Sequence, residues 1–222
     1  MKQNNDMESR RPLKVRSARF ATNFAKWLSQ QNITPNQISV MSVFFAGLSA
    51  ICLFLLPYYT DILSLILAIL AAVFIQGRLL CNLFDGMVAV EGGKSTAAGE
   101  LFNDIPDRIA DPLIIVAAGY AVVDVPWAST LAWVAAILAV MTAYVRTLAS
   151  SIGAPTSFAG PMAKQHRMAI LTLACCVTAV EAFIWQSSYA LLIALMVITI
   201  GCIITLFRRI MSAYTFLENN HK

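Results

Sequence analysis

Six of the twelve carboxylates of this chain lie between residues 82 and 111, within a sequence that is otherwise strongly apolar. They are Asp85, Glu91, Glu100, Asp104, Asp107 and Asp111. A charge at membrane depth is costly unless it is paired, hydrated or bound to a cation. Carboxylate and amide oxygens suit hard cations such as Mg²⁺ and Mn²⁺, which bind through one or two carboxylates plus substrate phosphates. The cluster therefore predicts a positively charged occupant.

The spacing of these residues predicts two polar helix faces. Asn82 and Asp85 are three residues apart and share a face of one helix. On the next helix four acids fall within a stripe of about 60°, with Asn103 at its border; they are Glu100, Asp104, Asp107 and Asp111. A short Gly-Gly turn joins the two helices, so we expect them to be antiparallel neighbours with opposed acidic faces.

A salt-bridge network is the simplest alternative explanation of this stripe. Arg78 and Arg108 are close enough in the sequence to neutralise two carboxylates. They cannot neutralise six, so a network alone does not account for the cluster. An ion path through a transporter is a further alternative, because ionisable residues in membrane spans often mark such paths.

The composition predicts one polytopic membrane domain. The chain has 222 residues, of which 59% are hydrophobic and 13% are charged, and its mean hydropathy is +0.70. Soluble domains carry about 25% charged residues. The five cysteines fit neither a disulfide framework nor a metal-binding spacing and are interpreted as buried thiols.

Apolar runs near ~20 residues predict an all-α protein with six membrane spans. The spans are expected at about 38–56, 62–90, 96–123, 127–152, 168–185 and 189–207. The predicted organisation has three parts: a cytoplasmic N-terminal tail with a juxtamembrane helix (1–36), a six-span membrane domain (37–210) and a cytoplasmic tail (211–222).

The distribution of basic residues predicts the orientation. The short connections 57–61, 124–126 and 186–188 contain none of the sixteen lysines and arginines. The positive-inside rule therefore places both termini in the cytoplasm, with the acidic cluster at the inner surface of a cell (inner) membrane. The net charge of +4 is expected to face anionic headgroups rather than nucleic acid.

Two features precede the first span. Phe20, Phe24 and Trp27 recur at helical spacing and predict an interfacial amphipathic helix. Thr34 then provides an N-cap, Pro35 suits the first helical position, and Gln37 completes a capping box.

The acidic stretch resembles the signature of the CDP-alcohol phosphotransferase (CDP-alcohol phosphatidyltransferase) family, D-x2-D-G-x2-A-R-x8-G-x3-D-x3-D. The matching residues are Asp85, Gly86, Ala89, Gly99 and Asp107. Asn82 and Asn103 replace the first and third aspartates, and Val90 replaces the arginine. A divergent bacterial branch of the family is similar in carrying Asn at both places and an acid directly after the second.

The resemblance implies a six-span enzyme, often a homodimer, in phospholipid biosynthesis. Mg²⁺ or Mn²⁺ would hold the pyrophosphate of a CDP-linked lipid, with CDP-diacylglycerol as the preferred donor. A small alcohol would attack the β-phosphorus, and CMP would leave. Carried over by position, Asp85, Asp107, Asn82 and Asn103 become metal-site residues, and Asp107 also becomes the candidate general base. Gly86, Ala89 and Gly99 would line the nucleotide.

The two asparagines remove two negative charges from this implied site. Our hypothesis is that Asp104 and Asp111, on the same stripe, replace the missing carboxylates as metal ligands. A member that has lost activity and serves as a scaffold is an alternative, because fold does not dictate function. A cation or small-solute transporter is another, although the duplicated halves common in transporters are absent from the sequence.

Basic residues near the fourth and fifth spans form a second candidate group. Arg146, Lys164 and Arg167 are expected on the same side of the membrane as the acidic cluster. They predict a pocket for a lipid phosphate or a phosphorylated acceptor. Ordinary positive-inside anchoring is the alternative for Lys164 in particular.

Overall fold

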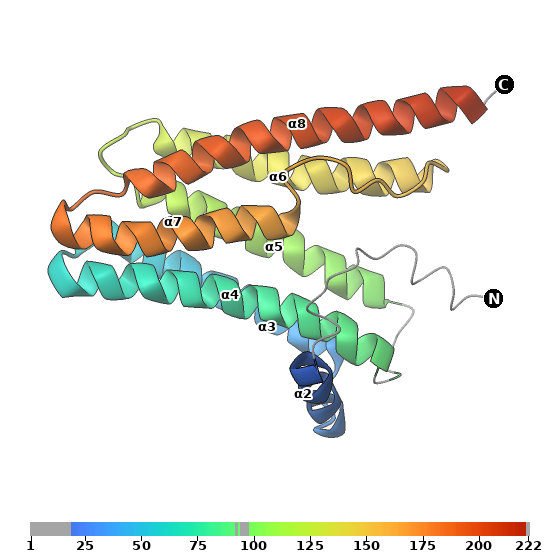
Figure 1. Cartoon of the computed structure of the whole chain (residues 1–222), viewed down its shortest axis with the longest axis horizontal. Helices are drawn as coiled ribbons and strands as arrows, with labels where there is room; N and C mark the ends of the chain where they lie inside the picture. Colours follow the sequence, from blue (N-terminus) through green and yellow to red (C-terminus); the bar gives the residue numbers. More distant parts are fainter. Residues whose placement is uncertain (1–18, 92, 94–97, 221–222) are drawn as a thin grey trace.

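The described part of the chain is an elongated bundle of helices (Figure 1). The structure is a computed structural model and describes residues 19–91, 93 and 98–220. Seven α-helices and one 3₁₀ turn make up this part: α2 (Arg19–Gln30), α3 (Pro35–Leu55), η2 (Leu56–Tyr58), α4 (Asp61–Glu91), α5 (Gly99–Tyr120), α6 (Ala128–Ser151), α7 (Lys164–Ile184) and α8 (Tyr189–Asn220). The prediction of an all-α protein is confirmed for the described residues. Residues 1–18 of the tail and most of the turn 91–95 lie outside them.

Five of these helices are long and apolar enough to cross a membrane. They correspond to the first, second, fourth, fifth and sixth predicted spans. Helix α5, the predicted third span, does not qualify, since it carries the charged residues Asp104, Asp107, Arg108 and Asp111. Helix α8 continues beyond Phe207, the predicted end of the last span, to Asn220.

The start of α3 follows its sequence signal. The Thr34 hydroxyl accepts a hydrogen bond from the Gln37 amide at 3.3 Å, and the Gln37 side chain accepts one from the Thr34 amide at 2.9 Å. These reciprocal bonds satisfy two backbone donors that a helix start leaves open. The capping box is therefore confirmed, with Pro35 in the first helical turn.

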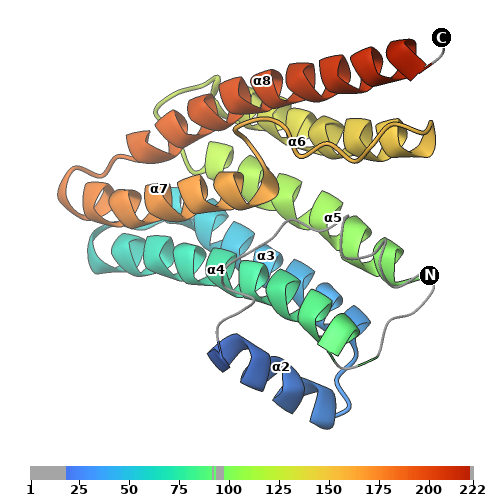
Figure 2. The ribbon, with the colours of Figure 1, turned by 45° about the vertical axis from the view of Figure 1, so that its right-hand side comes forward.

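Helix α2 stands apart from the main bundle and lies beside the end of α4 (Figure 2). Its Phe24 ring contacts the Phe84 ring of α4 at a centroid distance of 4.7 Å. Ala25 is buried in the same small cluster, whereas Trp27 is half exposed. One face of α2 is thus packed on the bundle and another is open.

The two acidic helices, α4 and α5, pack against other helices than the sequence predicts. Helix α4 packs mainly against α3 and α7, whereas α5 packs mainly against α3 and α6. The two acidic helices are therefore not the close antiparallel pair that the short turn predicts. Instead, each of them packs extensively against α3.

Small residues allow α6 to approach α5 closely. The buried face of α6 is built largely of alanines: Ala128, Ala132, Ala135, Ala136 and Ala139. A Cβ placed on Gly119 of α5 would lie 2.3 Å from the Ala132 Cβ. This close packing of backbones is common between membrane helices.

The segment 152–163 runs back alongside α6 before α7 begins (Figure 1). Gly160 has a φ of 109°, and the Met162 amide donates to the Thr205 hydroxyl of α8 at 2.9 Å. The segment is thereby attached to α8. Helix α7 begins at Lys164, four residues earlier than the predicted span, so Lys164 and Arg167 both belong to its first turn.

Gly160→Ala is expected to destabilise the fold by roughly 2–4 kcal/mol, from positive-φ strain together with overpacking. A Cβ there would lie 2.7 Å from the Thr205 Cα and 2.6 Å from its side chain. Gly153→Ala is the matched control, because its φ is 93° but nothing lies within 4 Å of a Cβ; it should cost about 1–2 kcal/mol. Unfolding of the purified proteins in detergent measures both, and equal losses would contradict the steric argument.

Candidate active site

Arg78 of α4 is the centre of the polar interior. Its side chain is 0% exposed, and its Nη2 lies 2.8 Å from Oδ1 of Asp107 and 2.5 Å from Oδ1 of Asp111. The two aspartates are four residues apart on α5, so they share one face of that helix. A buried guanidinium requires such partners, because an unpaired charge in the interior is strongly destabilising.

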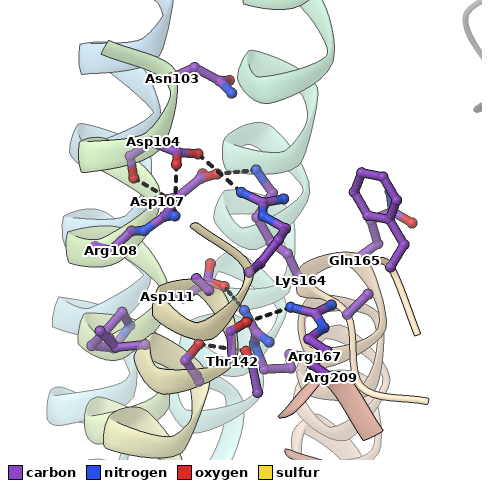
Figure 3. A pocket seen from close by; sticks show the side chains of 17 residues that line it. Asn103, Asp104, Asp107, Arg108, Asp111, Thr142, Lys164, Gln165, Arg167 and Arg209 are labelled. Atoms are coloured by element: carbon purple, nitrogen blue, oxygen red, sulfur yellow. Dashed lines mark hydrogen bonds and ion pairs between the residues drawn. The ribbon is translucent and has the colours of Figure 1, made fainter. Parts of the chain in front are cut away.

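Two cations from the first turn of α7 complete these ion pairs. The Lys164 ammonium contacts Oδ2 of Asp107. Arg167 donates to Oδ2 of Asp111 at 2.8 Å and to the Met162 carbonyl at 3.1 Å. Figure 3 shows these side chains converging from α5 and α7. Each oxygen of Asp107 and of Asp111 therefore lies against a cationic side chain.

Asp104 forms a third, more exposed group. Its Oδ2 accepts from Arg108 of the same helix at 2.8 Å, and its Oδ1 lies 3.4 Å from Arg146 of α6. About a third of the Asp104 side chain is exposed. The Arg146 guanidinium also lies over the Phe158 ring, 5.9 Å from its centroid, which is a cation–π distance.

These groups line a cavity of about 230 Å³ between α5, α6 and the start of α7. Its polar lining includes Asn103, Asp104, Asp107, Arg108, Asp111, Thr142, Arg146, Lys164, Gln165, Arg167 and Arg209. The Arg209 guanidinium, from α8, donates to the Thr142 carbonyl and to the Ala159 carbonyl at 3.2 Å. The cavity thus combines many fixed donors with a few carboxylates, a chemistry suited to anionic groups.

Asp85 occupies a different environment on α4. Only 3% of it is exposed, and its Oδ2 accepts a hydrogen bond from the Ser39 hydroxyl of α3 at 2.7 Å. Its Oδ1 is buried and accepts no hydrogen bond from the described residues. One turn earlier, the Asn82 side chain donates to the Arg78 carbonyl, while its own buried Oδ1 is also without a partner.

The structure therefore divides the predicted site residues into two sets. Asn103, Asp104, Asp107 and Asp111 line the cavity, together with the three predicted phosphate-binding residues Arg146, Lys164 and Arg167. Asn82 and Asp85 do not line it, although Asp85 is near enough to interact electrostatically with Lys164 and Asp107. Of the predicted nucleotide-binding residues, Gly86 and Ala89 are partly buried on α4, and Gly99 begins α5.

Sequence reasoning missed several residues of the site. Ser39, Arg209 and Phe158 carry no local signal, because each meets its partner through the fold rather than through helical spacing. Arg78 and Arg108 were the two cations that the sequence placed near the stripe. Arg146, Lys164 and Arg167 pair with it as well as Arg78 and Arg108.

The side-chain oxygens available to a metal suit one hard divalent cation better than a centre of several metal ions held by many carboxylates. Among the residues that the structure describes, no three His, Cys, Asp or Glu side chains are gathered as they would be around a metal. A cation at Asp104 or Asp111 would have to displace an arginine. The unpartnered oxygens of Asn82 and Asp85, in contrast, are ligands of the type that Mg²⁺ and Mn²⁺ prefer.

The fold has known relatives, although the sequence alone detects none. No protein-family model matches the sequence, and no curated protein matches it. Among solved structures, phosphatidylinositol phosphate synthase PgsA1 of Mycobacterium tuberculosis with CDP-DAG bound is similar at a TM-score of 0.71 and 19% identity, over 89% of this chain and 95% of that one.

Two further structures of the same mycobacterial enzyme are also similar. The complex with manganese and citrate has a TM-score of 0.69 and 18% identity, over 88% of this chain and 89% of that one. The apo form has a TM-score of 0.70 and 17% identity, over 87% of this chain and 95% of that one. At identities of 17–19% the likeness establishes the fold.

Proposed function

We propose that this chain belongs to a divergent branch of the CDP-alcohol phosphotransferase family and acts in phospholipid biosynthesis. It transfers a phosphatidyl group from a CDP-linked lipid to a small alcohol and releases CMP, with CDP-diacylglycerol as the preferred donor. The observation that carries the proposal is the fold likeness to phosphatidylinositol phosphate synthase with CDP-DAG bound, which covers 89% of this chain. The signature positions that α4 and α5 retain support it independently.

The proposal includes six membrane spans, with α5 as the third, and both termini in the cytoplasm of a cell (inner) membrane. Aromatic side chains near the ends of the helices are well exposed, as expected for an interface belt: Tyr58, Tyr59, Trp127, Trp185 and Tyr189. Helix α2 is proposed to lie on the inner leaflet, with its half-exposed Trp27 toward the lipid. A homodimer is proposed from the family resemblance.

The proposed cofactor is Mg²⁺ or Mn²⁺, in keeping with the manganese complex of the mycobacterial relative. Asn82 and Asp85 would hold it, since each has a buried oxygen without a partner. When bound, such an ion neutralises charge on a transferring phosphoryl group and polarises its phosphorus. That Asn103, Asp104, Asp107 and Asp111 also bind the metal stays a prediction, and the ion pairs of the three aspartates count against it.

The chain's own residues then divide the remaining work. Asp107, which borders the cavity, takes the proton of the acceptor hydroxyl. The acceptor oxygen forms a bond to the β-phosphorus, the bond from that phosphorus to the bridging oxygen breaks, and CMP departs with that oxygen. Arg146, Lys164 and Arg167 hold the lipid phosphate or an acceptor phosphate, and Arg167 also keeps Asp111 in place. The residues Gly86, Ala89 and Gly99 flank the nucleotide.

A non-catalytic role is the second candidate function, because one observation favours it. Asp104, Asp107 and Asp111 are all held in ion pairs with arginine or lysine. Such a network can stabilise a membrane bundle without any chemistry. A degenerate relative acting as a scaffold would keep these pairs and lack turnover.

CMP release by the purified protein separates the two functions. The assay supplies CDP-diacylglycerol, Mn²⁺ and a panel of small alcohols, some of them phosphorylated. We expect acceptor-dependent CMP release that stops when the metal is chelated. Asp85→Asn should lower the rate roughly a hundredfold, as for loss of a metal-site residue.

Asp124→Asn is the matched control, because Asp124 is an exposed carboxylate in the short connection between α5 and α6. It should leave the rate of CMP release unchanged. No CMP release with any acceptor would favour the scaffold. Loss of activity in the Asp124 variant would mean that the assay reports general damage to the protein.

A further inference from the structure

The charge balance of the cavity limits how many cations it can take. Among the described residues, five cationic side chains form ion pairs with three aspartates there. The ion-paired group therefore carries an excess of two positive charges, before Arg209 is considered. Adding divalent cations to this group raises the positive charge further, and each one is opposed by like-charge repulsion.

Asp107 is the residue at which the chain's own cations take the place of a metal. Its Oδ1 accepts from Arg78, which is 0% exposed and fixed by a second ion pair to Asp111. Its Oδ2 contacts the Lys164 ammonium. A divalent ion at Asp107 would have to displace one of these cations, and Arg78 is held in place by its second pair to Asp111.

Asp85 is different in this respect. It pairs with no lysine or arginine among the described residues; its Oδ2 accepts from a neutral hydroxyl, and its Oδ1 has no hydrogen-bond partner. This carboxylate is almost fully buried and forms no ion pair within the described part of the chain, and Lys164 acts on it only as a nearby charge. The Asn82 carbonyl oxygen, also buried and without a partner, is on the same helix face.

We infer that the chain binds a single divalent cation, which is held by Asp85 and Asn82. At Asp107, the positive charges of Lys164 and Arg78 take the place of a second divalent cation. The inference rests on the proposed function, and it gives Lys164 the role of replacing the second metal ion. One carboxylate and one amide oxygen form a sufficient protein ligand set for Mg²⁺ or Mn²⁺, because water completes the coordination in the resting protein and substrate phosphates can replace that water. Lys164 is 30% exposed, so its flexible stem can also reach a phosphate in the cavity.

The stoichiometry of Mn²⁺ on the resting protein tests the inference. Titration calorimetry of the full chain in detergent should give one Mn²⁺ per chain. Electron paramagnetic resonance should show the spectrum of an isolated ion, not of two spin-coupled ions as in sites where the metals are about 4 Å apart. Asp85→Asn should weaken binding by roughly tenfold or more, and Asp107→Asn by less than about threefold.

Lys164→Gln is the decisive variant, because it frees Oδ2 of Asp107. It should admit a second Mn²⁺ and introduce spin coupling. Arg146→Gln is the matched control: its side chain is equally exposed, at 30%, and pairs with Asp104 in the same cavity. It should still bind one Mn²⁺. No Mn²⁺ or two Mn²⁺ on the unmodified protein, or one Mn²⁺ on Lys164→Gln, would overturn the inference.

These outcomes are separate from those of the proposed function. One Mn²⁺ per chain without CMP release would reject the enzyme and leave the metal assignment standing. Two Mn²⁺ with CMP release would reject the replacement by Lys164 and leave the enzyme standing. Unfolding measurements on each variant identify any that has lost its fold, and the remaining variants still decide the question.

Discussion

Asp107→Asn is expected to lower the rate of CMP release by roughly 10²–10⁴-fold, the usual contribution of a positioned general base. Asparagine keeps the shape of the side chain and an oxygen for Arg78, but it cannot take the proton of the acceptor hydroxyl. The rate should fall mainly through kcat, because the substituted residue still lines the same cavity.

The ion pair to Lys164 means that Asp107, if it is the base proposed above, can act only with substrate present. In the structure both of its oxygens contact cations. Arg78 is fully buried, whereas Lys164 is partly exposed. We therefore expect an arriving phosphate to draw the lysine away and free Oδ2 for the hydroxyl proton. Acid–base geometry in a resting site often becomes productive only in the complex.

Asp104→Asn is the control for this prediction. Asp104 lines the same cavity, but its ion pairs are partly exposed. Its loss should cost about fivefold at most, which corresponds to the ~1 kcal/mol upper range of exposed pairs. Equal losses in the two variants, or full activity in Asp107→Asn, would remove Asp107 from the role of base.

The helices were largely predictable because their signals are local. An apolar run of about 20 residues must be a helix if it crosses lipid, since no other single segment satisfies its backbone there. The start of α3 was predictable to the residue, from Thr34 and Gln37. The start of α7 and the end of α8 were not, because these helices extend beyond the apolar residues into polar sequence.

The acidic stripe that lines the cavity was predictable from the sequence, but the partners of its residues were not. Helical spacing identifies the stripe of Asp104, Asp107 and Asp111, since neighbours on a face recur every three or four positions. The pairs Arg78–Asp107 and Arg167–Asp111 join residues 29 and 56 positions apart. Periodicity contains no information about such pairs, which depend on how α4, α5 and α7 pack.

Arg78→Met is expected to destabilise the folded protein by about 3–5 kcal/mol, the range for removing one partner of a buried ion pair. Arg78 contacts both Asp107 and Asp111, whose side chains are 9% and 4% exposed. Methionine fills much of the volume of the arginine stem but leaves each carboxylate with one cation only. Arg108→Met is the control: its pair with Asp104 is partly exposed and lies within one helix, so we expect a loss of only about 0.3–0.5 kcal/mol.

Unfolding of the detergent-solubilised proteins measures the loss of stability in both variants. A double-mutant cycle between Arg78 and Asp111 then tests whether the broken ion pairs cause the loss in Arg78→Met. If Arg78→Met destabilises the protein because each carboxylate has lost a cation, then adding Asp111→Asn should recover part of the lost stability. The reason is that the neutral amide no longer requires a second cation. Independent, additive losses would instead assign the effect of Arg78→Met to altered packing. In that case Arg78 would be a core residue of the bundle and not the cation that holds the two aspartates in position for the chemistry.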